Sequence, residues 1–148
     1  MTRVRAEMAI DREIPIVEAE ELWYDLSRWT AFMDGFDHVV RVDPEWPRSG
    51  ELLWDTHREG RGRVVERVTR YSVREGQESE IEDPKITGIQ RVRFGVGVIE
   101  LELDYQLKDS AWLMDLLFVR RAQRDSLWRT LRRFSIELRT DRELRASR

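Results

Sequence analysis

The hydrophobic period of the sequence changes directly after Val98-Ile99-Glu100-Leu101-Glu102-Leu103-Asp104-Tyr105-Gln106-Leu107-Lys108, and this change decides the fold. Apolar and polar residues alternate through this stretch, which predicts a strand with one packed and one solvated face. From about Trp112 the period becomes helical, because the apolar residues fall in one narrow stripe at about 100° per residue. The stripe contains Leu113, Leu116, Leu127, Leu131, Phe134 and Leu138. Ser110 is a suitable N-cap, and no proline or glycine follows before Arg142, so we expect one long terminal helix.

Upstream of this stretch, the sequence predicts a first strand, two short helices and a series of further strands. Alternation indicates a strand over Arg3–Asp11, and Pro15 precedes a helical face that ends near Leu26. A second short helix is expected over Arg28–Met33, before Gly35. Turn signals then separate the remaining strands, which predicts an antiparallel meander. Their expected ranges are Asp37–Asp43, Glu51–Arg58, Arg63–Arg74, Gln77–Glu82, Lys85–Gly95 and Val98–Lys108.

Length and composition indicate one globular domain covering residues 1–148. Apolar residues make up 41% of the chain and charged residues 37%, which is typical of a globular protein with its own core. The absence of cysteine excludes disulfides, thiolate catalysis and cysteine-based zinc sites. Neither a signal peptide nor an apolar run of the roughly 18 residues needed for a membrane span is evident. We therefore expect a cytoplasmic protein.

Charge is distributed unevenly along the chain. The net charge is −3, but Trp112 to Arg148 holds ten arginines and five acidic residues, a local net charge of +5. A basic helix of this kind could meet nucleic acid or acidic lipid. We favour the simpler interpretation, a solvated face of an amphipathic helix, and expect no nucleic-acid partner.

The order of elements resembles the START-like or SRPBCC superfamily, including its polyketide cyclase/dehydrase and lipid transport families. Local markers are Leu22-Trp23, Trp29, the run from Gly60 to Val68, and the terminal stretch from Phe118 to Phe134. The resemblance implies an α+β helix-grip fold: a curved antiparallel sheet of about seven strands around a long C-terminal helix, with two short helices after the first strand. It also implies a cavity for an apolar ligand between sheet and helix.

Arg120 is the most informative candidate for a ligand contact. It lies at the centre of the apolar stripe, with Gln123 and Arg124 at the edges, and a charge at a core position needs a partner or water. These residues could line the cavity mouth and hold an anionic group of a ligand. Alternatively, Arg120 reaches the helix edge or pairs with a carboxylate on the sheet. Leu116, on the same stripe, is a further candidate contact.

Other candidates come from the strands and the short helices. Gln90 shares a face with Ile86 and Val92, so it either contacts a ligand or satisfies a backbone group. Aromatic residues suit flat apolar ligands, although they could equally be ordinary core. The candidate wall residues are Trp29, Phe32, Trp54, Phe94 and Tyr105.

Glu66 is the candidate for proton transfer, together with Arg120. It shares a strand face with Val64 and Val68, and a carboxyl group in an apolar cavity has a raised pKa. It could equally be the counter-ion of Arg120, or a bulge could turn it outward. The only histidines, His38 and His57, lack a paired spacing, so we expect no metal site and no cofactor.

Three functions remain open from the sequence. We expect binding or transport of a hydrophobic or amphipathic small molecule, lipid or polyketide-like, by a non-enzymatic protein. The second is a polyketide aromatase/cyclase-type enzyme that moves protons through Glu66, Arg120 or Gln90. The third is a protein-interaction module that uses the acidic sheet face, the basic helix, or an exposed Trp46 or Trp128. A homodimer is compatible with all three.

Overall fold

The computed structural model describes residues 1–57, 59–109 and 115–148, with the backbone alone for 115 and 116. The strands are β1 (Thr2–Ala9), β2 (Phe36–Val42), β3 (Glu51–Thr56), β4 (Arg63–Ser72), β5 (Gly76–Glu82), β6 (Ile86–Gly95) and β7 (Val98–Leu107). The helices are α1 (Ile16–Tyr24), η1 (Leu26–Arg28), α2 (Trp29–Phe32), the π-helix η2 (Asp115–Val119) and α4 (Arg120–Ala146). The predicted α+β order is confirmed. The predicted start at Ser110 lies outside the described residues.

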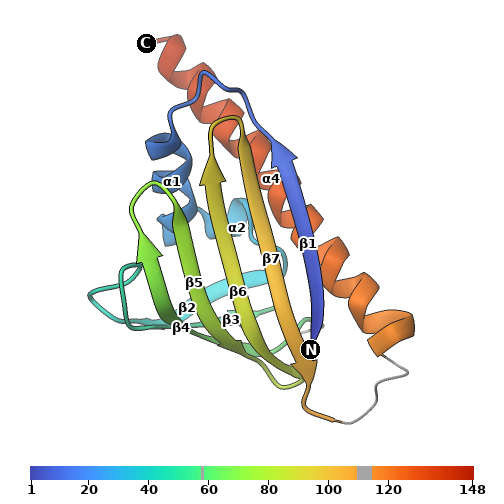
Figure 1. The fold of residues 1–148 in the computed structure, drawn as a ribbon. Helices are drawn as coiled ribbons and strands as arrows, with labels where there is room; N and C mark the ends of the chain where they lie inside the picture. The colour runs from blue at the N-terminus through green and yellow to red at the C-terminus, as the bar shows by residue number, and fades with distance from the viewer. Residues whose placement is uncertain (58, 110–114) are drawn as a thin grey trace.

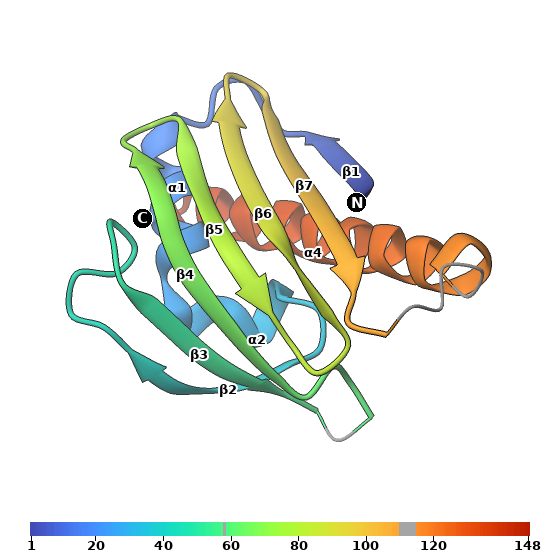
Figure 2. The same ribbon diagram turned by 60° about the horizontal axis from the view of Figure 1, so that its bottom comes forward.

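All seven strands form one antiparallel sheet in the order β1-β7-β6-β5-β4-β3-β2. Consecutive strands from β2 to β7 pair as hairpins, and β1 closes the far edge by pairing with β7. Figures 1 and 2 show α1, α2 and α4 on one side of the curved sheet, whose other side carries no helix among the described residues. This is the predicted helix-grip arrangement.

The terminal helix α4 is held by an apolar stripe and by ion pairs at its sides. Leu127, Leu131, Phe134 and Leu138 are buried, as the helical period predicts, and α4 packs mainly against β1 and α2. Arg28, just before α2, binds Glu137 and Asp141 of α4 at 2.8 and 2.9 Å. The C-terminal half of α4 therefore fills one end of the sheet.

The alternation seen in the strands places their side chains on two chemically different faces. On the inner face, Leu101, Leu103 and Tyr105 of β7 lie in the core. On the outer face, Glu102 and Asp104 bind Arg91 of β6 at 2.9 and 2.8 Å. No helix in the described ranges is both long and apolar enough to cross a membrane.

Candidate functional site

A pocket of about 350 Å³ opens between the N-terminal half of α4 and the loops at one end of the sheet. We call it the mouth pocket. The helix contributes residues three or four positions apart, so they share one face: Val119, Ala122, Gln123, Ser126 and Arg129. The opposite wall is Asp34, Gly35, Thr56, Glu59, Gly60, Arg61, Asp83, Lys85, Ile86 and Leu107. The lining thus combines apolar side chains with several charged groups.

The loop between β3 and β4 is folded against the pocket by Thr56. The Thr56 hydroxyl accepts a hydrogen bond from the Gly62 amide at 2.8 Å and donates to the Gly62 carbonyl at 3.0 Å. Gly62 has a φ of 92°, which favours glycine. A Cβ at Gly60 would lie 2.8 Å from the Thr56 hydroxyl oxygen, so this close approach also requires glycine. The two glycines fix the intervening Arg61 over the pocket wall.

Arg61 is held by a buried carboxylate. Its Nε donates to Oδ2 of Asp83 at 2.7 Å, and the Asp83 side chain is only 2% exposed. Oδ1 of Asp83 accepts from the backbone amides of Lys85 and Ile86 at 2.7 and 2.9 Å, which orients the carboxylate. Nη2 of Arg61 is buried and has no hydrogen-bond partner among the described residues. The guanidinium is therefore fixed through one nitrogen and keeps donors free for another group.

Asp34 forms the opposite corner of the pocket and ties α2 to α4. Its carboxylate accepts two hydrogen bonds from Arg129, both at 3.0 Å, and one from Ser126 at 2.7 Å. Burial raises the pKa of Asp34, but the bonds from Arg129 and Ser126 outweigh it and hold the pKa below its usual value. Asp34 is thus already paired, whereas Arg61 retains an unused donor.

Behind the pocket, Glu66 lies on the inner face of β4. It is buried, and Nε1 of Trp54 donates to its Oε2 at 2.6 Å. Burial raises the pKa of Glu66, while the Trp54 hydrogen bond and the charge of Arg61 act in the opposite direction. Of the two orientations that the sequence left open, the structure has the inward one, and the raised pKa favours a neutral carboxyl group.

Ser79 and Gln90 are register partners deeper on the inner face. The Ser79 hydroxyl is buried and makes no hydrogen bond within the described chain. Gln90 continues the inward series from Ile86 to Val92, as predicted. Together with Glu66 they place polar groups in an otherwise apolar interior.

No family model matches this sequence, and no curated protein does either. Solved structures do match. TTHA0849 from Thermus thermophilus has a TM-score of 0.70 at 18% identity, covering 95% of this chain and 99% of that one. A START superfamily protein from Mycobacterium smegmatis has a TM-score of 0.65 at 11% identity, covering 94% and 97%. The chain has a START-like fold.

A third match extends the comparison to a larger protein. DynU16, from the dynemicin biosynthetic locus, has a TM-score of 0.62 at 14% identity. The match covers 94% of this chain and 48% of DynU16. At such identities the likeness establishes the fold, and function must be argued from the site.

Within this START-like fold, the predicted aromatic wall is core. Trp29, Phe32, Trp54, Phe94 and Tyr105 are all buried, none more than 8% exposed, and none lines the mouth pocket. The rings pack on one another: the Trp29 and Trp54 centroids lie 5.9 Å apart, for example. Alternation predicted that these side chains point inward, and the structure places all five in the hydrophobic core cluster.

Arg120 and Arg124 lie outside the mouth pocket, and Arg120 reaches solvent, as the alternative interpretation of this residue expected. Both are exposed, neither lines the mouth pocket, and within the described chain Arg120 pairs with no carboxylate. The first turns of α4 project past the edge of the sheet, so the centre of the apolar stripe meets solvent there (Figures 1 and 2). Glu66 consequently is not the counter-ion of Arg120. Gln123 does line the pocket, and the side chain of Leu116 lies outside the described residues.

Sequence reasoning missed the most specific polar group of the pocket. Arg61 stands between two glycines, in the run from Gly60 to Val68 that served only as a marker of the resemblance, and its partner Asp83 stands directly before Pro84. A charged residue enclosed by two conformationally special glycines was the available signal. The pairing itself joins residues that are far apart in sequence and needed the fold.

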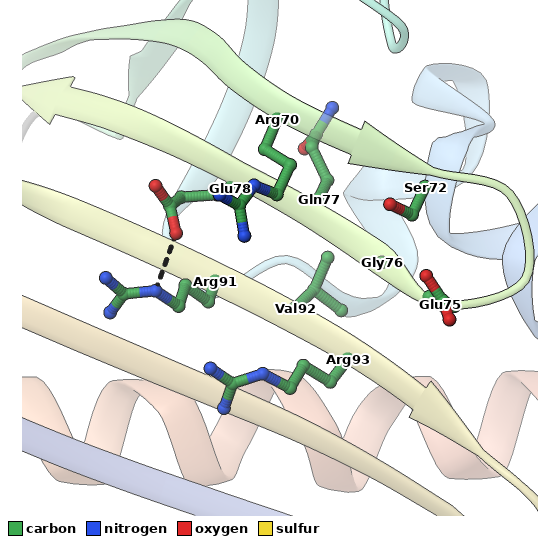
Figure 3. Close-up of a pocket in the computed structure, with 9 residues that line it drawn as sticks. All are labelled: Arg70, Ser72, Glu75, Gly76, Gln77, Glu78, Arg91, Val92 and Arg93. Carbon is green, nitrogen blue, oxygen red and sulfur yellow. Dashed lines mark hydrogen bonds and ion pairs between the residues drawn. The ribbon is translucent and has the colours of Figure 1, made fainter.

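A second groove, of about 200 Å³, lies on the outer face of the sheet. Figure 3 shows Arg70, Glu78, Arg91 and Arg93 rising from β4, β5 and β6 on the same side. Arg91 binds Glu78 at 2.8 Å, and Arg93 binds Glu100 at 2.7 Å. Because most of these charges neutralise one another, this groove offers a ligand less than the mouth pocket does. The outer carboxylates predicted as an acidic interaction face are paired with arginines in the same way.

Proposed function

We propose that the mouth pocket binds an amphipathic small molecule whose anionic group contacts Arg61. The observation that carries the proposal is the orientation of Arg61: Asp83 holds it through Nε, and neither Nη1 nor the buried Nη2 has a hydrogen-bond partner among the described residues. A carboxylate, sulfonate or phenolate is the natural acceptor for such a donor. Ile86, Leu107 and Val119 supply the apolar surface for the rest of the molecule.

Binding is favoured over proton transfer because Glu66 does not line the pocket. Trp54 donates to one of its oxygens, and the carboxyl group does not border the space that a ligand at Arg61 would occupy. Carriage of such a ligand, rather than its conversion, is therefore the function that we propose.

The probe for this proposal is 8-anilinonaphthalene-1-sulfonate, which joins an anionic group to aromatic rings and fluoresces in apolar surroundings. A charge-assisted hydrogen bond contributes about 1.5–3 kcal/mol, so Arg61→Gln should weaken binding by roughly 10- to 100-fold. Arg63→Gln is the matched control, because Arg63 pairs with Asp55 on the exposed face. Equal affinity of the Arg61 and Arg63 variants would contradict the proposal.

A second variant keeps the test informative if Arg61→Gln folds poorly. Ala122 lines the pocket and is exposed, so Ala122→Trp should occupy the pocket at little cost to the core. We expect it to abolish binding of the probe while the thermal transition stays unchanged. Unaltered binding by this variant would place the probe elsewhere.

A further inference from the structure

The first turns of the terminal helix expose apolar side chains. Leu117 and Phe118 are 57% and 60% exposed, and Trp128, further along, is 38% exposed. Elsewhere on α4, Ile136 and Leu144 are exposed singly. Adjacent exposed apolar residues are unusual on a protein surface and mark an interaction site.

Arginines are interleaved with these apolar residues. Leu117, Arg121, Arg124 and Trp128 follow one another at helical spacings, and Arg120 lies between them, so they share one side of the helix. Leu117, Phe118, Arg120, Arg121, Arg124 and Trp128 are together named the projecting face. Figures 1 and 2 show that this end of α4 extends beyond β1 at the edge of the sheet.

The arginines of the projecting face are not neutralised. Arg120, Arg121 and Arg124 are exposed, and within the described ranges none of them forms an ion pair. Asp125 is the only acidic residue between 117 and 128. Further along α4, Arg129 binds Asp34 and Arg142 binds Glu18, whereas Arg132 and Arg139 are exposed and form no ion pair among the described residues. The projecting face differs in that its three unpaired arginines lie close together in the sequence, among exposed apolar side chains.

We propose that the projecting face docks on an anionic membrane surface. A helix that presents leucine, phenylalanine and tryptophan among arginines is suited to lie at the boundary between lipid headgroups and acyl chains. Its charges match anionic lipids, whereas the chain as a whole has a net charge of −3. A nucleic acid would use the arginines but leave Leu117 and Phe118 exposed, so a bilayer fits the whole face better.

The mouth pocket lies on the other side of the same helical turns. At about 100° per residue, Val119 and Ser126, which line the pocket, are roughly opposite Leu117, Arg121 and Trp128, so docking of the projecting face leaves the pocket turned away from the bilayer. The inference stands without the proposed function, because vesicle binding is measured with no ligand present.

The test is co-sedimentation of the full chain with vesicles of phosphatidylcholine alone or mixed equally with phosphatidylglycerol. Each arginine near an anionic surface strengthens binding about fivefold, so the triple variant Arg120→Gln, Arg121→Gln, Arg124→Gln should bind mixed vesicles on the order of a hundredfold more weakly. The charge-matched control is Arg132→Gln, Arg139→Gln, Arg148→Gln, which changes three exposed arginines, two further along α4 and one just after its end. We expect this control to retain most of the binding.

The apolar part of the face has its own pair of variants. Leu117→Ser with Phe118→Ser should weaken binding to mixed vesicles by at least about tenfold, since two apolar side chains no longer enter the bilayer. The control is Ile136→Ser with Leu144→Ser, two comparably exposed residues further along α4.

Three outcomes would overturn the inference. The first is equal loss in the two arginine triples, which would indicate general electrostatic attraction. The second is absence of vesicle binding together with a dimer by light scattering that Leu117→Ser, Phe118→Ser dissociates, because the face would then join two copies. The third is binding of duplex DNA in place of vesicles.

Discussion

Arg61→Gln and Arg63→Gln form a pair of substitutions that differ mainly in burial. Both arginines donate from Nε to an aspartate, Arg61 to Asp83 at 2.7 Å and Arg63 to Asp55 at 2.9 Å. The Asp83 side chain is 2% exposed and the Asp55 side chain 25%. Glutamine removes the charge in each case, so the comparison isolates the effect of the surroundings.

The expected loss of stability follows from these exposures. Removing one partner of a buried pair costs about 3–5 kcal/mol, because the other charge stays buried and uncompensated. Arg61 is 25% exposed and Asp83 keeps two backbone hydrogen bonds, so we expect a value below that range, about 2–3 kcal/mol. The pair of Arg63 and Asp55 should contribute little, because solvent and salt screen the attraction between exposed charges.

Thermal unfolding followed by circular dichroism measures the difference. For a domain of this size about 1 kcal/mol corresponds to roughly 3 °C, so Arg61→Gln should lower Tm by about 6–9 °C, while Arg63→Gln should leave Tm almost unchanged. Adding Asp83→Asn to an Arg61→Leu variant should recover on the order of 1 kcal/mol of the free energy of unfolding. Asparagine keeps an acceptor for the backbone amides but carries no buried charge that lacks a partner. Equal losses for the Arg61 and Arg63 variants would refute this account of the loop.

Two further predictions concern the interior. Because burial raises the pKa of Glu66, the folded state holds a proton that the unfolded state releases, so stability falls as pH rises from the unfolded pKa through the folded pKa of this residue. The gain in Tm on Glu66→Gln should therefore grow as the pH rises above the ordinary glutamate pKa of about 4, and a gain independent of pH would contradict the raised pKa of Glu66. Phe134→Ala should cost about 3–5 kcal/mol in urea unfolding, since the side chain is fully buried. Ile136→Ala, at a residue 49% exposed on the same helix, should cost less than about 1 kcal/mol, and similar values for the two would contradict the assigned helix face.

The fold could be predicted from the sequence because the alternation of apolar residues in the strands and their helical repeat in the terminal helix are strong, local patterns. The alternation in β7 assigned Leu101, Leu103 and Tyr105 to the core correctly, and the helical stripe did the same for Leu131 and Phe134. Each of these predictions depends only on which face a residue occupies, and that is fixed by local geometry.

The residues of the candidate site were harder to predict from these periods than the fold was. The helical period placed Arg120 correctly on the face of the helix that carries the apolar stripe. The period does not reveal whether the sheet extends far enough to cover that part of the helix. Inward alternation placed Trp54 and Phe94 in the interior, yet whether they line a cavity depends on what packs in front of them. Arg61 was missed because its partner Asp83 is brought to it only by the pairing of β3 with β4 and β4 with β5.

The account rests most on the mouth pocket as the ligand site, and a two-dimensional ¹H–¹⁵N NMR titration with 8-anilinonaphthalene-1-sulfonate tests this directly. The amides of Gly35, Gly60 and Gln123 report on the pocket, and the indole of Trp54 reports on the interior behind it. We predict that the largest shifts occur at these pocket amides and that Arg61→Gln abolishes them. Shifts concentrated on the outer groove around Arg91, or at Trp128 alone, would contradict the account.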